Sequence, residues 1–256
     1  MSVKSQLSAY LARSAQVLRT NAIKVVRMEG ANEPNRKPIT LFTLNSHHDL
    51  SQFSKGCDAD IGGTSTVNLT LEQSSPTEKR FAKFWGEMHL GVRPEVQGLV
   101  RGGYAGFWSK RRTTLFGDIL DDLSHHKYLA LRVRSGGNPR TRNSYFVNIK
   151  TDSAFSSDLW QHRLFFRKDQ GQWEDVFIPL EDFVLRNTGE NVQARIRMNK
   201  ERVKTVGISF LGGHSGIEGQ YELGIDSIRA VNEEDADVPE KDPSEGTRWK
   251  RDRTAL

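Results

Sequence analysis

Two clusters of carboxylates are the residues whose type and spacing come nearest to catalytic chemistry. One cluster holds Asp118, Asp121 and Asp122, and the other is the adjacent pair Glu181 and Asp182. Two carboxylates across a cleft, one of them buried and protonated, would be sufficient to hydrolyse a glycosidic bond. Both clusters lie at predicted turns or strand ends, where carboxylates commonly bind the backbone. We therefore expect solvated side chains there rather than a catalytic pair.

Residues that bind metals are sparse. The seven histidines include adjacent pairs at 47–48 and 125–126, and neighbours in a pair point apart on a helix or a strand. The single Cys57 rules out a zinc site of several cysteines and an internal disulfide. Asp58 and Asp60 precede two glycines and could offer oxygen ligands to a structural calcium ion, but they have no complete ligand loop. We expect no metal, and keep structural calcium as the weaker alternative.

A glycine-rich stretch at 212–219 is a candidate for phosphate binding. Its spacing differs from the G-x-G-x-x-G of a dinucleotide loop, and the residues after it alternate as in a strand. A phosphate-binding loop opens a helix, so a hairpin loop is the better interpretation. The sequence also lacks G-x-x-x-x-G-K-[ST] and G-x-S-x-G. We predict a protein that is not an enzyme and has no cofactor.

An aromatic residue beside a basic cluster is more informative. Trp108 is followed, after one serine, by Lys110, Arg111 and Arg112. Aromatic and arginine side chains dominate the binding energy of protein interfaces. We predict that these four residues form a partner-binding edge, with a place in the core as the alternative for Trp108. Trp173 is expected to be a core residue, because large aromatic side chains dominate core energetics.

The net charge of +5 comes from the start of the chain. Residues 1–28 contain five basic residues and no acidic one, which leaves 32 of each in residues 29–256. On a helix, Leu7, Leu11 and Leu18 would share one narrow face. This pattern predicts a mitochondrial presequence, or alternatively an amphipathic helix of the fold or of a membrane surface. Because the rest of the chain is formally neutral, a nucleic-acid partner is not expected.

Apolar and polar residues alternate with a period of two between residues 39 and 231. Clear examples are 66–72, 128–134 and 145–150. Such alternation predicts strands with one buried and one exposed face, arranged in antiparallel sheets. Turn-forming residues separate the strands, and only short helical turns are expected, near 46–53 and 180–185. We predict an all-β fold, an antiparallel β-sandwich or jelly roll, over residues 39–231.

Composition changes on both sides of this domain. Residues 29–38 contain two prolines and are predicted to be a linker. Residues 232–256 carry a block of acidic residues and then a block of basic ones, which predicts a charged, disordered tail. No run of about 18 apolar residues occurs, so no membrane-spanning helix is predicted.

An ordered set of short motifs resembles the complex I intermediate-associated protein family, which assembles mitochondrial respiratory complex I. The motifs are Asp60-Ile-Gly-Gly-Thr-Ser65, Phe84-Trp-Gly-Glu-Met88, Gly102-Gly-Tyr-Ala-Gly-Phe107, Asp122-Leu-Ser124, Tyr128-Leu-Ala-Leu-Arg-Val-Arg134, Gln172-Trp-Glu-Asp-Val-Phe-Ile-Pro-Leu-Glu-Asp-Phe183 and Gly224-Ile-Asp-Ser-Ile-Arg229. Each motif alone is weak, whereas their order over nearly all of 39–231 is specific. The resemblance implies a galactose-binding-like jelly roll in an assembly factor or chaperone of the mitochondrial matrix. It implies no catalytic residues.

Three functional classes follow from these observations. The first is an assembly factor that makes transient contacts with complex I assembly intermediates and other assembly factors, associated at most peripherally with the matrix face of the inner membrane. The second is a carbohydrate-binding module of the jelly-roll type. The third is an enzyme that uses the carboxylate clusters. We expect the first, because both the family resemblance and the predicted import segment favour it.

Overall fold

The computed structural model describes residues 3–26, 36–75, 77–153, 155, 157–187, 190–191, 196–213 and 215–236. Three of the predicted segments therefore fall partly or mostly outside the described residues. These are the end of the predicted presequence, the predicted linker up to residue 35 and the predicted tail from residue 237.

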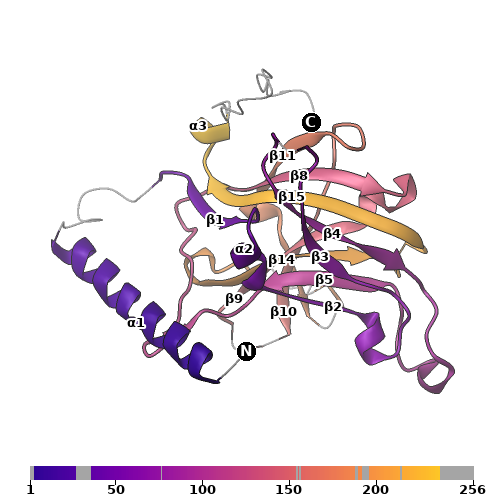
Figure 1. Cartoon of the computed structure of the whole chain (residues 1–256), viewed down its shortest axis with the longest axis horizontal. Helices are drawn as coiled ribbons and strands as arrows, with labels where there is room; N and C mark the ends of the chain where they lie inside the picture. Colours follow the sequence, from indigo (N-terminus) through magenta and orange to yellow (C-terminus); the bar gives the residue numbers. More distant parts are fainter. Residues whose placement is uncertain are drawn as a thin grey trace.

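Two antiparallel sheets form the body of the protein (Figure 1). The first sheet contains, in spatial order, β11 (Trp173–Pro179), β8 (Tyr128–Gly137), β15 (Gly219–Val231), β4 (Phe81–Met88) and β3 (Asn68–Glu72), and β1 (Ile39–Thr43) also pairs with β15. The second sheet contains β13 (Glu190–Asn191), β12 (Val184–Asn187), β10 (Asp158–Arg163), β9 (Tyr145–Thr151), β14 (Val203–Leu211), β5 (Tyr104–Ser109) and β2 (Phe53–Cys57). A separate hairpin joins β6 (Thr113–Thr114) to β7 (Gly117–Asp118). The predicted all-β sandwich is confirmed.

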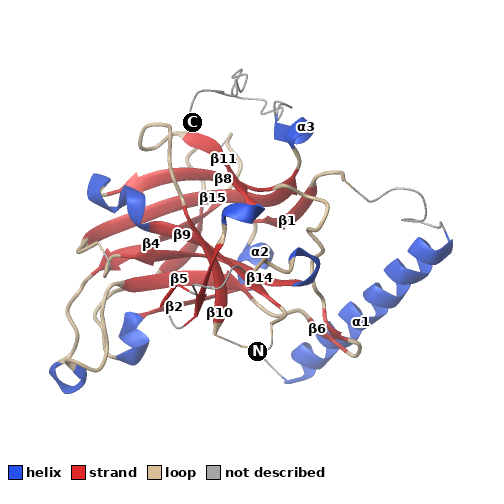
Figure 2. Ribbon diagram, turned by 180° about the vertical axis from the view of Figure 1, so that it is seen from behind, coloured by secondary structure: helices blue, strands red, loops and turns tan. Residues whose placement is uncertain are grey.

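Helices are few and mostly short (Figure 2). The α-helices are α1 (Val3–Val26), α2 (His47–Ser51) and α3 (Glu233–Ala236). The 3-10 helices are η1 (Asp58–Ile61), η2 (Pro94–Val96), η3 (Pro139–Ser144), η4 (Leu180–Asp182) and η5 (Lys200–Arg202). The helical turns predicted near 46–53 and 180–185 are confirmed as α2 and η4. Ser46 begins α2 because its hydroxyl accepts a hydrogen bond from the Asp49 N–H, while the Asp49 carboxylate accepts one from the Ser46 N–H.

The core lies between the two sheets and is rich in aromatic rings. Phe84 of the first sheet packs on Phe107 of the second, with ring centroids 5.0 Å apart. Tyr221 of the first sheet stacks on Phe210 of the second at 4.8 Å. All four rings are at most 1% exposed, so these cross-layer contacts hold the sandwich together through apolar burial.

The last two long strands, β14 and β15, each occupy the middle of a different sheet. β14 lies between β9 and β5, and β15 lies between β8 and β4. β14 ends at Leu211 in the second sheet and β15 begins at Gly219 in the first, so the two strands form no hairpin and the prediction of a hairpin loop for 212–219 is wrong. Turn chemistry alone does not tell whether the next strand pairs with the last one or crosses to the opposite sheet.

Trp173 lies on the outer surface of the first sheet rather than in the core. Trp173 begins β11, which was predicted as a strand. Because side chains alternate along a strand, Trp173 lies on the face opposite to that of Glu174 and Val176. The half-buried Trp173 ring meets the edge of Phe81 at 5.1 Å and faces the guanidinium of Arg134 at 5.3 Å. The prediction of a core position is therefore wrong.

Helix α1 lies beside the small hairpin at one end of the sandwich (Figure 2). The buried Ser14 hydroxyl accepts a hydrogen bond of 3.0 Å from the Leu115 N–H. Leu7, Leu11 and Leu18 remain exposed on this helix. In the described part of the chain, no helix is both long and apolar enough to cross a membrane.

Candidate functional site

The outer face of the second sheet carries a row of side chains that runs across its strands. Pairing registers place these residues side by side in the order Ser54, Trp108, Gly207, Asn148, Gln161 and Val184. The adjacent row contains Gly56, Gly106, Ser209, Phe146 and Arg163. The two rows combine a tryptophan, three glycines and a group of amide and hydroxyl side chains on one surface.

Two aromatic rings in this region lie against glycines. A β-carbon at Gly56 would be 3.1 Å from Cη2 of Trp108, and one at Gly106 would be 2.8 Å from the Tyr104 hydroxyl oxygen. The absence of side chains at these glycines therefore lets both rings lie close to the sheet. Trp108 is 40% exposed and Tyr104 is 37% exposed, so each still offers surface to a ligand. The core alternative for Trp108 is wrong.

A chain of hydrogen-bonded polar side chains crosses three strands of the same face. The Gln161 amide donates to Asn148 Oδ1 at 2.8 Å, and the Asn148 amide donates to the Ser209 hydroxyl at 2.9 Å. Gln161 is only 6% exposed, yet its Oε1 atom has no hydrogen-bond partner among the described residues. A buried polar atom without a partner costs stability, unless a water or a ligand satisfies it.

Two hollows lie on the outer face of the second sheet, one lined by Asn148 and the other by Gln161, and a hydrogen bond joins these two side chains. The Trp108 hollow has a volume of about 550 Å³, and residues that line it include Tyr104, Trp108, Lys110, Arg111, Asn148 and Lys150. The Phe146 hollow has a volume of about 580 Å³, and residues that line it include Phe146, Gln161, Arg163, Phe165, Asp182 and Arg186. We call the two hollows together the outer groove.

Three of the four predicted partner-binding residues meet at this groove. Trp108, Lys110 and Arg111 line the Trp108 hollow. The Arg111 guanidinium also binds Asp118 at 2.7 Å, although its side chain stays 64% exposed. Arg112 points to a different environment and binds the half-buried Asp121 at 2.5 Å. The structure thus brings the first three together and places Arg112 outside the hollow.

The carboxylates of the first cluster are occupied by cations and hydrogen-bond donors. Burial alone would raise the pKa of Asp118, but hydrogen bonds from Arg111, Thr113 and Lys204 lower it. Burial raises the pKa of Asp121 despite the opposing effect of Arg112. Ionic pairing of this kind holds the loop at 111–121 together, and nothing in it opposes one carboxylate to another across a cleft.

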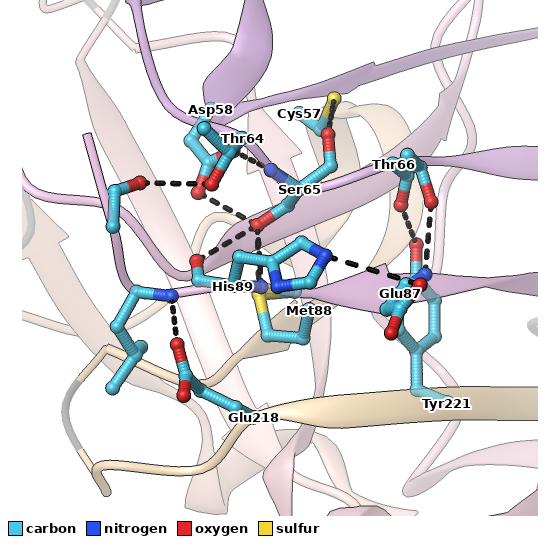
Figure 3. Close-up of polar contacts among 12 residues, drawn as sticks. Cys57, Asp58, Thr64, Ser65, Thr66, Glu87, Met88, His89, Glu218 and Tyr221 are labelled. Carbon is cyan, nitrogen blue, oxygen red and sulfur yellow. Dashed lines mark hydrogen bonds and ion pairs between the residues drawn. The ribbon is translucent and has the colours of Figure 1, made fainter. Parts of the chain in front are cut away.

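A buried carboxylate fixes the loop that follows β2 (Figure 3). Asp58 is fully buried and accepts hydrogen bonds from Ser65 N at 2.9 Å, Ser65 Oγ at 2.9 Å, Gly103 N at 2.5 Å and Tyr104 N at 3.3 Å. Four donors on one carboxylate satisfy a buried negative charge without a metal ion. Asp58 therefore ties β2 and the Gly62–Gly63 turn to the start of β5, and so positions Tyr104 at the groove.

The neighbouring contacts in Figure 3 attach the same loop to the first sheet. Ser65 Oγ accepts from the His89 N–H at 3.1 Å, and the Tyr221 hydroxyl donates to the Thr66 carbonyl at 2.8 Å. Burial raises the pKa of Tyr221 well above its ordinary range, so the phenol keeps its proton and remains a donor. Among the described residues, no three His, Cys, Asp or Glu side chains gather into a metal-binding group. Asp58 and Asp60 act as structural acceptors in this arrangement.

Sequence reasoning missed several residues of the groove, namely Tyr104, Asn148, Gln161 and Ser209. When one strand is considered alone, a polar residue on its outer face cannot be distinguished from an ordinary solvent-exposed side chain. These residues are brought together by the pairing register between strands, which cannot be read from a single sequence. Of these four residues, only Tyr104 belongs to a sequence motif noted above, because it lies between glycines in Gly102–Phe107.

The model of the complex I intermediate-associated protein 30 family matches residues 42–225. The chain belongs to this family. A member from Neurospora crassa, named complex I intermediate-associated protein 30, mitochondrial, is 34% identical over 240 residues, which cover 86% of this chain and 82% of that protein. The resemblance inferred from the ordered motifs is confirmed.

The fold of this family member is also found in a solved structure. The family 11 carbohydrate-binding module of a Clostridium thermocellum cellulase superposes with a TM-score of 0.52 at 10% identity, covering 78% of this chain and 96% of the module. A family 30 carbohydrate-binding module has a TM-score of 0.46 at 12% identity, covering 82% and 93% of the two chains. At such identities the likeness shows the jelly-roll fold alone, which confirms that prediction.

Proposed function

We propose that this protein takes part in the assembly of mitochondrial respiratory complex I. The observation that carries the proposal is membership of the complex I intermediate-associated protein 30 family, with a match over 42–225 and a named relative at 34% identity. We infer that the protein acts by transient contacts with assembly intermediates and with other assembly factors, as a chaperone acts, and that it catalyses no reaction.

The environment of Asp58 and Asp118 supports a role without catalysis. Asp58 is saturated by backbone and hydroxyl donors, and Asp118 is bound by two cations. A general acid or base needs a carboxyl group that can reach a reacting atom. Carboxylates whose oxygens are already hydrogen-bonded or ion-paired within a loop do not meet this requirement.

For the contact surface, we propose Trp108, Lys110, Arg111 and Arg112. Trp108 is exposed beside three basic residues, and this composition is typical of residues that dominate binding energy. Arg112 lies outside the Trp108 hollow, where Asp121 binds its guanidinium, so it would contribute its charge from beside the hollow.

We also propose that residues 1–28 direct import and that the protein works in the mitochondrial matrix, associated at most peripherally with the inner membrane. The relative from Neurospora is named as mitochondrial, and α1 carries an exposed apolar face with no acidic residue in its first turn. A fluorescent reporter fused to residues 1–28 is expected to enter mitochondria. A diffuse cytosolic signal would contradict the import function.

Native gel electrophoresis of mitochondria from cells that lack this protein tests the assembly role. Assembled complex I should fall and partly built intermediates should remain, with the other respiratory complexes unchanged. Reintroduction of the wild-type chain should restore complex I, and so should the Asp118→Asn or Asp182→Asn variant, because neither carboxylate has a catalytic task. Normal complex I in the cells without the protein would refute the proposal.

Sugar binding is a second candidate, and one observation favours it. The rings of Trp108 and Tyr104 lie close to glycines of an open sheet face and present exposed surface, and aromatic platforms of this kind can stack on sugar rings. Isothermal titration with neutral β-glucan oligosaccharides would test this candidate, and saturable binding lost in Trp108→Ala would support it.

A further inference from the structure

We propose that the outer groove binds an extended, acidic segment of a partner polypeptide. The groove is the pair of hollows on the outer face of the second sheet whose lining residues Asn148 and Gln161 are joined by a hydrogen bond. The segment would lie across the strands, with one end at Trp108 and the other near Val184.

The length of the groove fits a short peptide. From Trp108 on β5 to Val184 on β12, the row passes through β14, β9 and β10, which makes four steps between neighbouring strands. At about 4.8 Å per step, the row spans roughly 19 Å. An extended chain rises about 3.3 Å per residue, so about six residues would cross the groove.

The floor of the groove offers what a peptide backbone needs. Gln161 Oε1 is a buried acceptor without a partner among the described residues, and a rotation of the Gln161 side chain toward the groove would bring it to a peptide N–H. Asn148 and Gln161 are linked amides that together present a hydrogen-bonding strip between the two hollows. The exposed Trp108 at one end and Phe165 at the other provide apolar contacts for side chains that flank this strip.

The charge around the groove sets the character of the segment. Five cationic side chains line the two hollows, three in the first and two in the second, against the single carboxylate of Asp182. Arg111 also binds Asp118 but remains 64% exposed, and the Arg163 guanidinium lies 5.2 Å from the centroid of the Phe146 ring. A cationic rim speeds and strengthens binding of an acidic partner. A neutral sugar could accept hydrogen bonds from these cations but would gain no ionic attraction, so the groove favours an acidic peptide over an oligosaccharide.

A direct binding assay tests the chemistry. The purified full chain is titrated into a fluorescein-labelled peptide of about eight residues, long enough to cross the groove, that alternates Glu with Ala. Polarisation should report saturable binding that weakens as salt rises, because screening reduces attraction between exposed charges. The same peptide with Gln in place of every Glu should bind at least about tenfold more weakly.

Matched variants assign the binding to the groove. Trp108→Ala should weaken binding about tenfold, whereas Trp85→Ala should not, although Trp85 is similarly exposed on the outer face of the first sheet (38% against 40%). The double reversal Lys110→Glu with Arg163→Glu should also weaken it, whereas Lys79→Glu with Arg80→Glu, in the turn before β4, should not. Gln161→Leu keeps the volume of the floor and removes its acceptor, and should weaken binding without unfolding the chain.

Three results would overturn the inference. They are equal binding of the acidic and neutral peptides, equal effects of the groove and control variants, and tight binding of a neutral β-glucan oligosaccharide that depends on Trp108. In all cases thermal melting of each variant must match the wild type, so that loss of binding cannot come from unfolding.

The groove has this role only if the protein acts through partner polypeptides, as proposed above, and the cell assay separates the two ideas. If cells without the protein assemble complex I normally, the assembly function fails. If they do not, but the Trp108→Ala and double-reversal variants restore complex I as well as the wild type does, the assembly function stands and the groove is not its contact surface.

Discussion

Replacement of Asp58 by asparagine should destabilise the whole domain, although it changes a single oxygen into an amide nitrogen. Asp58 is fully buried and its two oxygens accept hydrogen bonds from Ser65, Gly103 and Tyr104. An amide can keep only one of these oxygens. The least costly orientation keeps Oδ2, which serves three donors, and turns the amide nitrogen toward the Ser65 N–H.

The magnitude follows from these contacts. The Ser65 N–H would lose its acceptor inside the protein, which costs about 1–3 kcal/mol. The remaining bonds would change from charge-assisted to neutral, a loss of about 1 kcal/mol for the short bond to Gly103. Ser65 Oγ loses less, because it also lies 3.0 Å from the His89 carbonyl oxygen. Relief from burying a charge offsets part of the sum, so we expect a net loss of about 2–3 kcal/mol.

Urea unfolding of the full chain, followed by tryptophan fluorescence, measures this loss as a shift in midpoint at constant slope. In a domain of this size the thermal midpoint should fall by roughly 4–12 °C. Asp60→Asn is the matched control, because Asp60 lies on the same 3-10 turn, is exposed and accepts a single bond from Cys57 N. We expect it to cost less than about 0.5 kcal/mol. Equal stabilities for the two variants would refute the clamp that we assign to Asp58.

Three further expectations concern stability. Asp118→Asn should lower the thermal midpoint at pH 7, and its difference from the wild type should shrink below about pH 4. A carboxyl group with a lowered pKa contributes stability above its ordinary pKa, and this stability is lost as the pH falls through the folded-state pKa. A constant difference in midpoint down to pH 3 would contradict this. Gly103→Ala should cost at least about 3 kcal/mol, since φ is 92° and the new β-carbon would lie 2.4 Å from a backbone nitrogen, whereas Gly98→Ala, with φ 83° and open space, should cost about 1 kcal/mol in urea unfolding. Trp173→Ala should cost about 2 kcal/mol, less than the roughly 3–5 kcal/mol of Phe84→Ala in the core, and thermal melts that rank them in the opposite order would restore Trp173 to the interior.

Alternation in the sequence was enough to predict the strands, but not how they are arranged. Residues 128–134 and 145–150 were predicted as strands and are part of β8 and β9. Alternation states which residues share a face, because side chains on a strand point to opposite sides in turn. It does not tell which face is buried when both carry large apolar side chains. In β11 one face has Trp173 and Phe177 and the other has Val176 and Ile178, and only the second face meets the core.

The groove was visible in part for a similar reason. Trp108 and the basic residues after it are adjacent in sequence, so their common location could be predicted. Gln161 is 13 residues from Asn148 in the sequence, and Ser209 is 61 residues from it. The three side chains meet only because β9 pairs with β10 and β14 in this register. Contacts between distant strands depend on register and strand order, which a single sequence does not specify.

The position of β14 and β15 has a consequence for the order in which the chain can fold. Each is a central strand of its sheet, and β15 pairs with β1, β4 and β8, which come from the first half of the chain and its middle. The second sheet cannot close before Leu211 has left the ribosome, and the first cannot close before Val231 has left it. Until then β4, β5, β8 and β9 present unpaired edges, which are open to pairing with other chains. Newly made protein therefore has to be kept from aggregating until its last strand is delivered, and a chain that stops before β14 should remain unfolded as a whole.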